Sequence, residues 1–186
     1  PNAIFQFKFD DDEGILAPNS PFIETPSRQD GPRHFCFHPE LNILYTSNEQ
    51  GCSVTAYEID RKSGTLSAVQ TVSTLPADYD GDNSCSQIQI TPSGSFLYAP
   101  NRGHDSIAGF KVDPSTGQLT PIGNTPAERV PRAFSIDPQG HFLYAAGLET
   151  GKLTSFRINQ QTGALESFGT YPVGASPMWV LITHSN

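Results

Sequence analysis

Short runs of alternating apolar and polar residues follow one another along the chain, separated by turn residues. The runs "HFCFH", "QIQI" and "AFSI" each alternate and each leads into a turn that contains proline. A run such as "FLYA" follows the turn, and a third run, such as "SVTAYEI", alternates again before a hairpin signal of the D-x-x-x-G or N-x-x-x-G type. Helical periodicity is missing over any long stretch. The pattern predicts an all-β protein of short antiparallel strands.

These runs recur in one order in three segments, 35–49, 88–102 and 134–148. In each segment a tyrosine stands six residues after the turn proline; these tyrosines are Tyr45, Tyr98 and Tyr144. Four strands in every 40–50 residues or so is the period of a β-propeller. A β-sandwich with accidental similarity is the alternative, and the fixed offsets argue against it.

The repeat divides the chain into blades of four antiparallel strands. Residues 33–75, 86–125 and 132–173 supply three full blades, residues 4–25 supply the outer two strands of another, and residues 176–182 supply the inner strand of a closing blade. We therefore expect an arc of about three full blades and two half-blades. Propellers close into rings because open edges leave sheet faces in water. A four-unit ring made by pairing the terminal half-blades lacks one strand.

Composition excludes several classes of function. The 186 residues carry a formal net charge of −8 without a Lys/Arg-rich run, so we expect no nucleic-acid partner. No apolar stretch approaches the length of a membrane span, so we expect no membrane partner. The cysteine count is three, and no CxxC is present. We expect reduced thiols in a cytoplasmic protein rather than a disulfide framework or a structural zinc site.

The strand order gathers charges at one end of the blades. The start of each first strand and the end of each second strand lie at this end, and the first strand is innermost. Two pairs of charges stand at equivalent repeat positions, Arg33 with Arg132 and Glu49 with Arg102. Because arginine binds phosphate and carboxylate through a planar fork of donors, we expect an anion pocket at the channel rim. A solvated rim of stray charges is the alternative. The candidate site residues are Arg33, His34, Glu49, Arg102, His104 and Arg132.

A metal site would need the histidines to converge. His34 and His38 point the same way along one strand but lie about 13 Å apart, which is too far for one ion. His104 is the third histidine of this set. We predict no metal and no cofactor. "GCSVT" does not match a nucleophilic-serine motif.

Several phrases together resemble a known family: "GPRHFCFHP", "SNEQGCSVTAYEID", "ITPSGSFLYAPNRGHDSIAGFKVD", "PRAFSIDPQGHFLYAAG" and "YPVGASPMWVLI". Their ordered set resembles the seven-bladed propeller lactonases, and looks most like the C-terminal half of the bacterial 6-phosphogluconolactonases. The resemblance implies a cytoplasmic, metal-independent enzyme that hydrolyses 6-phospho-D-glucono-1,5-lactone in the pentose phosphate pathway. It also implies that the seven-bladed ring is completed by an N-terminal half, a cleaved partner chain or a second copy.

The proposed active site of a sister branch, the fungal 3-carboxy-cis,cis-muconate lactonizing enzymes, can be compared with this sequence residue by residue. Its proposed site positions match Arg33, Glu49 and Arg102 here, while its histidine belongs to a preceding blade and has no counterpart in this chain. Under this resemblance the two arginines bind phosphate or stabilise developing negative charge, and Glu49 acts as general base or acid. His34 is a further candidate partner in catalysis, and Arg132 and His104 are candidates for substrate binding. Muconate-type lactonization and a non-catalytic binding scaffold remain as alternatives.

Overall fold

The chain folds into antiparallel sheets that follow one another along the sequence. The computed structural model describes residues 2–26 and 28–183. No helix occurs among these residues, so the prediction of an all-β fold of four-stranded antiparallel blades is confirmed. The strands are β1 (Ile4–Asp10) and β2 (Ile15–Glu24) in a hairpin; β3 (Pro32–Phe37), β4 (Ile43–Asn48), β5 (Ser53–Ile59) and β6 (Leu66–Ser73) in the first blade; β7 (Gln89–Ile90), β8 (Phe96–Asn101), β9 (Ser106–Val112) and β10 (Leu119–Pro126) in the second; and β11 (Pro131–Ile136), β12 (Phe142–Gly147), β13 (Lys152–Ile158) and β14 (Leu165–Pro172) in the third.

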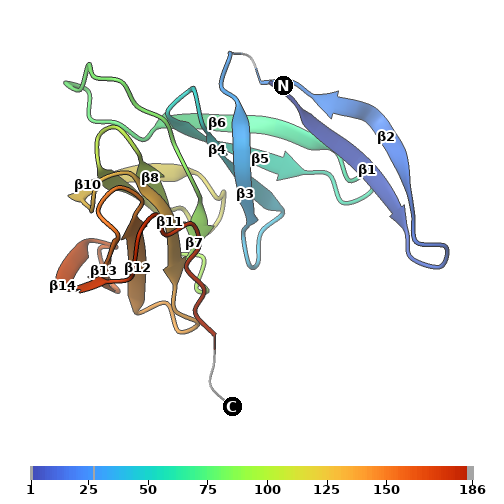
Figure 1. Cartoon of the computed structure of the whole chain (residues 1–186). Coiled ribbons are helices and arrows are strands. Elements are labelled where there is room, and N and C mark those ends of the chain that lie inside the picture. The colour runs from blue at the N-terminus through green and yellow to red at the C-terminus, as the bar shows by residue number, and fades with distance from the viewer. Residues whose placement is uncertain (1, 27, 184–186) are drawn as a thin grey trace.

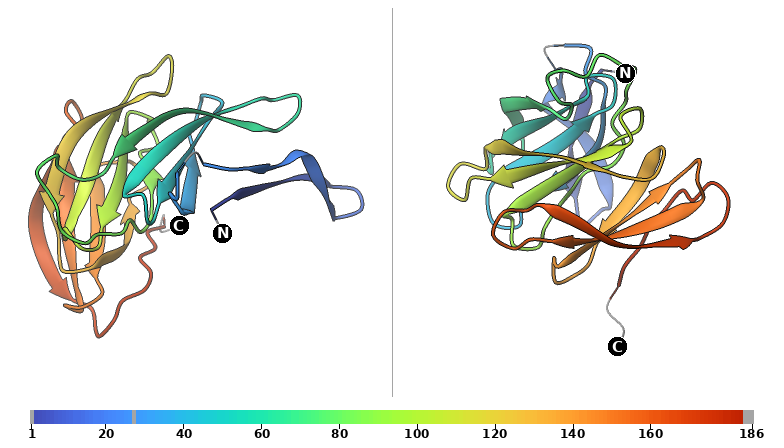
Figure 2. Two further views of the ribbon diagram at one scale, coloured as in Figure 1. Left: turned by 90° about the horizontal axis from the view of Figure 1, so that it is seen from above. Right: turned by 90° about the vertical axis from the view of Figure 1, so that its left-hand side faces the viewer.

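The three blades stand side by side as an arc, and the β1–β2 hairpin reaches away from the first blade (Figures 1 and 2). Inside each blade the strands pair in chain order. The hairpin is attached to the first blade through side-chain contacts: Leu66 N donates to Gln6 Oε1 (2.8 Å), and Asn19 Nδ2 donates to Ser63 O (2.7 Å). The start of β6 and the turn before it are thus bound to the hairpin.

The expected hairpin turns form with one geometry. In the second blade, Gly117 N donates to Asp113 O (2.8 Å), and the Asp113 carboxylate accepts the backbone N–H groups of Ser115 and Thr116. Those hydrogen bonds lower the pKa of Asp113. Gly117 has φ +71°, a conformation that glycine adopts without the steric penalty of a side chain. The same glycine-to-carbonyl bond recurs at Gly14, Gly64 and Gly163.

The core consists of two layers, each filled from two neighbouring blades. One layer lies between the first and second blades and centres on Tyr45, Val54, Leu97 and Phe110. The second layer lies between the second and third blades, and its largest fully buried side chains are Tyr98, Ile107, Phe134, Leu143 and Phe156. Because each layer needs both of its blades, the blades stabilise one another rather than folding as separate sheets.

The repeat tyrosines tie the blades together by buried hydrogen bonds. The Tyr45 hydroxyl donates to the Gly117 carbonyl of the next blade (2.7 Å), and the Tyr98 hydroxyl donates to the Gly163 carbonyl (2.7 Å). Tyr144 stands at the same position of the third blade, but its hydroxyl has no hydrogen-bond partner among residues 2–26 and 28–183. The repeat therefore contains one unused inter-blade contact at its C-terminal end.

Two inner strands differ from the sequence prediction. "QIQI" was expected as one strand, but only Gln89 and Ile90 are paired as β7; Cys85 forms an isolated bridge with Asn101. Residues 176–182, which were expected to form the inner strand of a closing blade, pair with no strand among the described residues, and Ser176 has φ +52°; their part in a closing blade stays a prediction. A strand needs a hydrogen-bonded neighbour, and in Figure 1 this segment leaves the third blade and descends away from the other sheets.

The two ends of the arc expose large apolar side chains. Phe35 is 61% exposed on the first blade, and Trp179 is 66% exposed beyond the third. Large exposed apolar patches are uncommon on proteins that have no further surface to bind. Others that are exposed at these ends are Phe5, Phe7, Phe9, Phe37, Phe168, Tyr171, Met178 and Leu181.

The inter-blade tyrosines make a stability prediction. Tyr98→Phe removes the donor of the buried Gly163 carbonyl, and we expect the free energy of unfolding to fall by about 1–3 kcal/mol in denaturant titrations. The matched control is Tyr144→Phe, whose hydroxyl lacks such a partner, and we expect a change within about 0.5 kcal/mol. Equal losses in the two variants would contradict the inter-blade role of the tyrosine.

Candidate functional site

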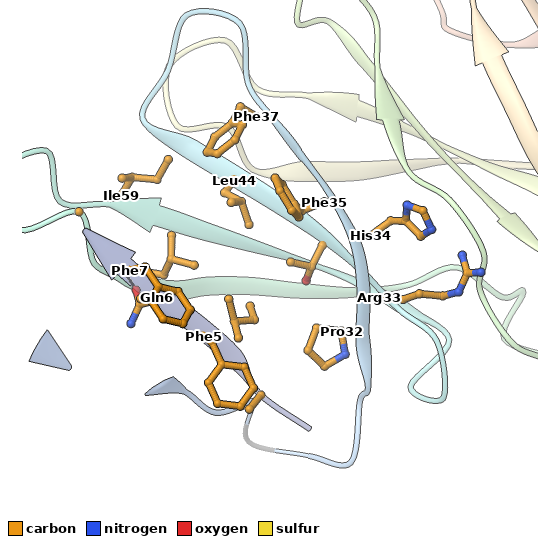
Figure 3. Close-up of a pocket in the computed structure, with 15 residues that line it drawn as sticks. Phe5, Gln6, Phe7, Pro32, Arg33, His34, Phe35, Phe37, Leu44 and Ile59 are labelled. Atoms are coloured by element: carbon orange, nitrogen blue, oxygen red, sulfur yellow. Dashed lines mark hydrogen bonds between the residues drawn. The ribbon is translucent and has the colours of Figure 1, made fainter. Parts of the chain in front are cut away.

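A β-bulge aims Arg33 at the rim. In the pairing of β3 with β4 the register shifts between Pro32 and His34, so Arg33 is the extra residue. A bulge twists the strand and re-aims the side chain that it carries. Figure 3 shows the result: Arg33 and His34 point toward the neighbouring blade, whereas Phe35 and Phe37 lie on the other side of β3. Simple alternation would have placed Arg33 with the phenylalanines.

The third blade repeats this bulge around Arg132. The register of β11 against β12 shifts between Pro131 and Ala133. The residue before each Pro-Arg pair has a positive φ, +63° at Gly31 and +56° at Val130. Two arginines are thus presented in the same way by two blades with different sequences.

Glu49 lies where the first blade meets the second. Its N–H donates to the Gly31 carbonyl (2.8 Å), and its carbonyl accepts the N–H of Cys85 (3.0 Å). Its carboxylate forms an ion pair with Arg33 Nε (3.5 Å) and accepts a hydrogen bond from Arg102 Nη2. Arg102 Nη2 also donates to the Cys85 carbonyl (3.0 Å). Backbone and side chain therefore fix one carboxylate between two arginines.

Both arginines keep a buried donor that nothing in the described chain accepts. Their side chains are 20% exposed for Arg33 and 15% for Arg102. Arg33 Nη1 and Arg102 Nε are buried and have no hydrogen-bond partner among residues 2–26 and 28–183. Burial lowers the pKa of Arg33; Glu49 opposes this shift, and Arg102 and Arg132 add to it. A buried, unpaired guanidinium donor is costly, and an oxyanion satisfies it well.

The comparison with known families decides where this chain belongs. The family described as "Lactonase, 7-bladed beta-propeller" matches residues 2–182. The chain belongs to the seven-bladed β-propeller lactonase family. The resemblance inferred from the sequence phrases is thereby confirmed.

Curated relatives of this chain include several bacterial enzymes that share one name. The 6-phosphogluconolactonase of Pectobacterium carotovorum is 40% identical over 152 residues, which are 82% of this chain and 46% of the relative. The 6-phosphogluconolactonase of Cronobacter sakazakii is 37% identical over 171 residues, 92% of this chain and 51% of the relative. The chain spans about half the length of these relatives.

Solved structures of lactonases share the arc. A putative 6-phosphogluconolactonase from Bacteroides fragilis aligns with a TM-score of 0.86 and 30% identity, over 96% of this chain and 51% of that one. The periplasmic gluconolactonase of Pseudomonas aeruginosa aligns with a TM-score of 0.87 and 25% identity, over 95% of this chain and 49% of that one.

His34 joins the rim in its neutral form. Burial lowers its pKa, and the positive charges of Arg33 and Arg132 lower it further, while Glu49 opposes the shift. Since an unperturbed histidine titrates near 6.5, a lowered value leaves the imidazole uncharged at neutral pH. The structure thus brings together Arg33, His34, Glu49, Arg102 and Arg132.

His104 is held apart from this group. Its Nδ1 shares a hydrogen bond with Ser106 Oγ (2.7 Å), and its ring packs edge-on against Tyr79 with centroids 4.7 Å apart. Within the described residues, neither contact reaches Glu49 or the arginines. Its predicted part in substrate binding stays a prediction.

The histidines do not converge on a metal. His38 Nδ1 accepts the N–H groups of Glu40 (3.1 Å) and Leu41 (2.9 Å), so it caps the proline turn at the far end of β3. Among the residues that the structure describes, no group of three or more His, Cys, Asp or Glu side chains could hold an ion. No helix in the same residues is long and apolar enough to span a membrane.

Sequence reasoning missed Cys85. The first and third blades place Pro32 and Pro131 before the bulged arginine, and the second blade has Cys85 at the equivalent position. Unlike proline, this cysteine has an N–H, which it donates to Glu49. Aligning the three repeats would have revealed the exchange, because a proline-to-cysteine change adds one donor.

The charges around His34 make a titration prediction with two opposite signs. Arg132→Gln removes a positive charge, so the pKa of His34 should rise; Glu49→Gln removes a negative charge, so it should fall. The measurement is the pH dependence of the His34 ring resonances by NMR, and the unsubstituted chain should titrate below about 6.5. Shifts in the same direction for both variants would contradict the arrangement.

Proposed function

We propose that the rim is the active site of a lactonase that hydrolyses 6-phospho-D-glucono-1,5-lactone, the activity that we expect to place the protein in the pentose phosphate pathway. The observation that carries this proposal is Glu49 fixed between Arg33 and Arg102, each of which keeps one unpaired buried donor. A carboxylate for proton transfer and donors for an anion are the two requirements of lactone opening. The names of the relatives, 6-phosphogluconolactonase, support the choice of substrate.

The proposed reaction uses Glu49 as a proton carrier. Water attacks the lactone carbonyl carbon while Glu49 accepts a water proton, and the carbonyl electron pair moves onto oxygen. An arginine donor stabilises that oxyanion. When the oxyanion collapses, the bond from the carbonyl carbon to the ring oxygen breaks, and the proton on Glu49 passes to that oxygen. The products are the open carboxylic acid and its freed hydroxyl, and Glu49 is regenerated.

The remaining rim residues take supporting parts in this proposal. Neutral His34 can accept a hydrogen bond or a proton beside Arg33. Arg132 adds positive charge from the third blade, where the substrate phosphate would extend. His104 stays as a proposed outer contact of the same ligand.

The competing functions differ in substrate rather than in geometry. Planar guanidinium groups bind carboxylates as well as phosphates, so a muconate-type lactone with several carboxylates would also fit this rim. A non-catalytic scaffold would bind an anion there without turnover. Assaying 6-phosphogluconolactone, unphosphorylated gluconolactone and a carboxymuconolactone separates these three outcomes.

We also propose that additional blades complete the ring, either an N-terminal half of the same protein, a cleaved partner chain or a second copy. The exposed apolar side chains at both ends of the arc support this proposal, because neighbouring blades would cover them. The cytoplasm is the compartment that we propose, on the strength of three free cysteines. A periplasmic gluconolactonase shares the fold, so the fold alone leaves the compartment open.

Substitution of Glu49 tests the mechanism in the completed propeller. Glu49→Gln keeps the size of the side chain but cannot accept the water proton, so we expect kcat/KM for 6-phosphogluconolactone to fall by at least about 10²-fold. The rate is measured against spontaneous hydrolysis of the lactone.

The matched control is Glu166→Gln. Glu166 is an exposed carboxylate on β14, away from the rim, and its substitution should leave kcat/KM unchanged. A Glu49 variant that turns over lactone as fast as the Glu166 variant would remove Glu49 from the mechanism.

A further inference from the structure

Two cysteines lie directly behind the rim, where the first blade meets the second. Cys52 ends the turn between β4 and β5 and is half-buried. Cys85 is completely buried and forms the bridge with Asn101. Neither thiol takes part in the proposed lactone chemistry.

The two sulfur atoms share one polar environment. Asn83 Nδ2 donates to Cys52 Sγ (3.3 Å) and to Asn101 Oδ1 (2.9 Å), and Cys85 Sγ lies 3.7 Å from that same Oδ1. The thiols also interact directly. A hydrogen bond from Cys85 lowers the pKa of Cys52 to about 6 against the effect of burial, and Asn83 and Arg102 lower it further. Cys52 therefore has more thiolate character than an ordinary cysteine, and Cys85 is the partner that keeps its proton.

Thr74 links the same two residues from the other side. Its hydroxyl lies 3.2 Å from Cys85 Sγ and donates to the Cys52 carbonyl (2.9 Å), which also accepts the Thr74 N–H (2.9 Å). The end of β6 thus holds the backbone of one cysteine against the side chain of the other.

The turn does not need a cysteine at position 52. Cys52 has φ +47°, in the left-handed backbone region that residues other than glycine, Asn and Asp rarely adopt. The equivalent turns of the other blades place Asp105 (φ +51°) and Gly151 (φ +64°) there. Glycine adopts this backbone conformation without strain, so a cysteine at this position costs conformational energy that glycine would avoid.

We propose that Cys52 and Cys85 are a peroxide-sensitive thiol pair that closes into a reversible disulfide behind the rim. In the first step the Cys52 thiolate attacks hydrogen peroxide: an S–O bond forms, the O–O bond breaks, and hydroxide leaves, so that sulfur is oxidised and peroxide reduced. In the second step the Cys85 sulfur attacks the sulfur of the Cys52 sulfenic acid: an S–S bond forms, the S–O bond breaks, and the departing hydroxide leaves as water with the proton of the Cys85 thiol. A thiol reductant restores both cysteines.

The disulfide would reach the rim through the backbone of Cys85. The Cys85 N–H binds the Glu49 carbonyl, and its carbonyl binds Arg102 Nη2. Drawing Cys85 toward Cys52 therefore displaces both backbone groups, the N–H that binds Glu49 and the carbonyl that binds Arg102. Oxidation should loosen that pair and alter the surroundings of His34.

The experiment exposes the chain to hydrogen peroxide, blocks the remaining thiols and maps peptides by mass spectrometry. We expect a Cys52–Cys85 cross-link that lacks two hydrogens and disappears with dithiothreitol. Cys36 is the internal control, because burial raises its pKa to about 12. Cys52 should react with iodoacetamide at least about tenfold faster than Cys36. Absence of the cross-link, or equal alkylation rates, would overturn the proposal.

Matched variants separate chemistry from folding. Cys52→Gly removes the thiol and suits the left-handed turn, so it should fold and give no cross-link; Cys36→Ser should cross-link as the unsubstituted chain does. The His34 ring resonances should shift on oxidation and return on reduction, and they should stay fixed in Cys52→Gly. A cross-link without that shift would overturn the connection to the rim. None of these measurements uses lactone hydrolysis, so their outcome is independent of the proposed function.

Discussion

The ion cluster of Arg33, Glu49 and Arg102 is the constraint on which the rim depends. The carboxylate of one blade binds the guanidinium of the next, and it also pairs with the guanidinium of its own inner strand. Such a cluster tolerates little movement because both arginines are largely buried, and separating the charges would leave them unpaired away from water. The relative position of the first two blades is therefore fixed by chemistry as well as by apolar packing.

The same blade design produces both structure and site. Tyrosine and the hairpin glycine recur at fixed places and bind one blade to the next. At the rim, the repeat instead varies. The bulge carries Arg33 in the first blade and Arg132 in the third, and the equivalent repeat position of the second blade is Ser86. The position after the second strand carries Glu49, Arg102 or Leu148. A scaffold with little freedom thus holds positions whose residues can change without altering the fold.

Much of this architecture could be predicted from the sequence because it depends on local rules. Alternating runs and turn residues indicate strands, and offsets such as Pro39 to Tyr45 identify the blades. The meeting of Glu49 with Arg102 followed from strand direction and repeat position. The bulge at Arg33 did not follow, since it arises from how β3 pairs with β4 rather than from residue type.

Other features depend on contacts that the sequence pattern does not encode. The segment 176–182 contains a short apolar run typical of a strand, yet a strand forms only beside a hydrogen-bonded neighbour, and the described residues provide none there. The Cys52–Cys85 pair joins residues 33 positions apart through Asn83, Thr74 and Asn101, none of which stands in a recognisable thiol motif.

The most direct test of the rim as an anion site is the affinity of the completed propeller for 6-phosphogluconate, the proposed product, measured by titration calorimetry. Arg102→Gln should weaken binding by at least about tenfold, because a charged, desolvated donor is lost. Lys111→Gln, an exposed control on β9, should bind as the unsubstituted protein does. An Arg102→Gln variant with unchanged affinity would contradict the account.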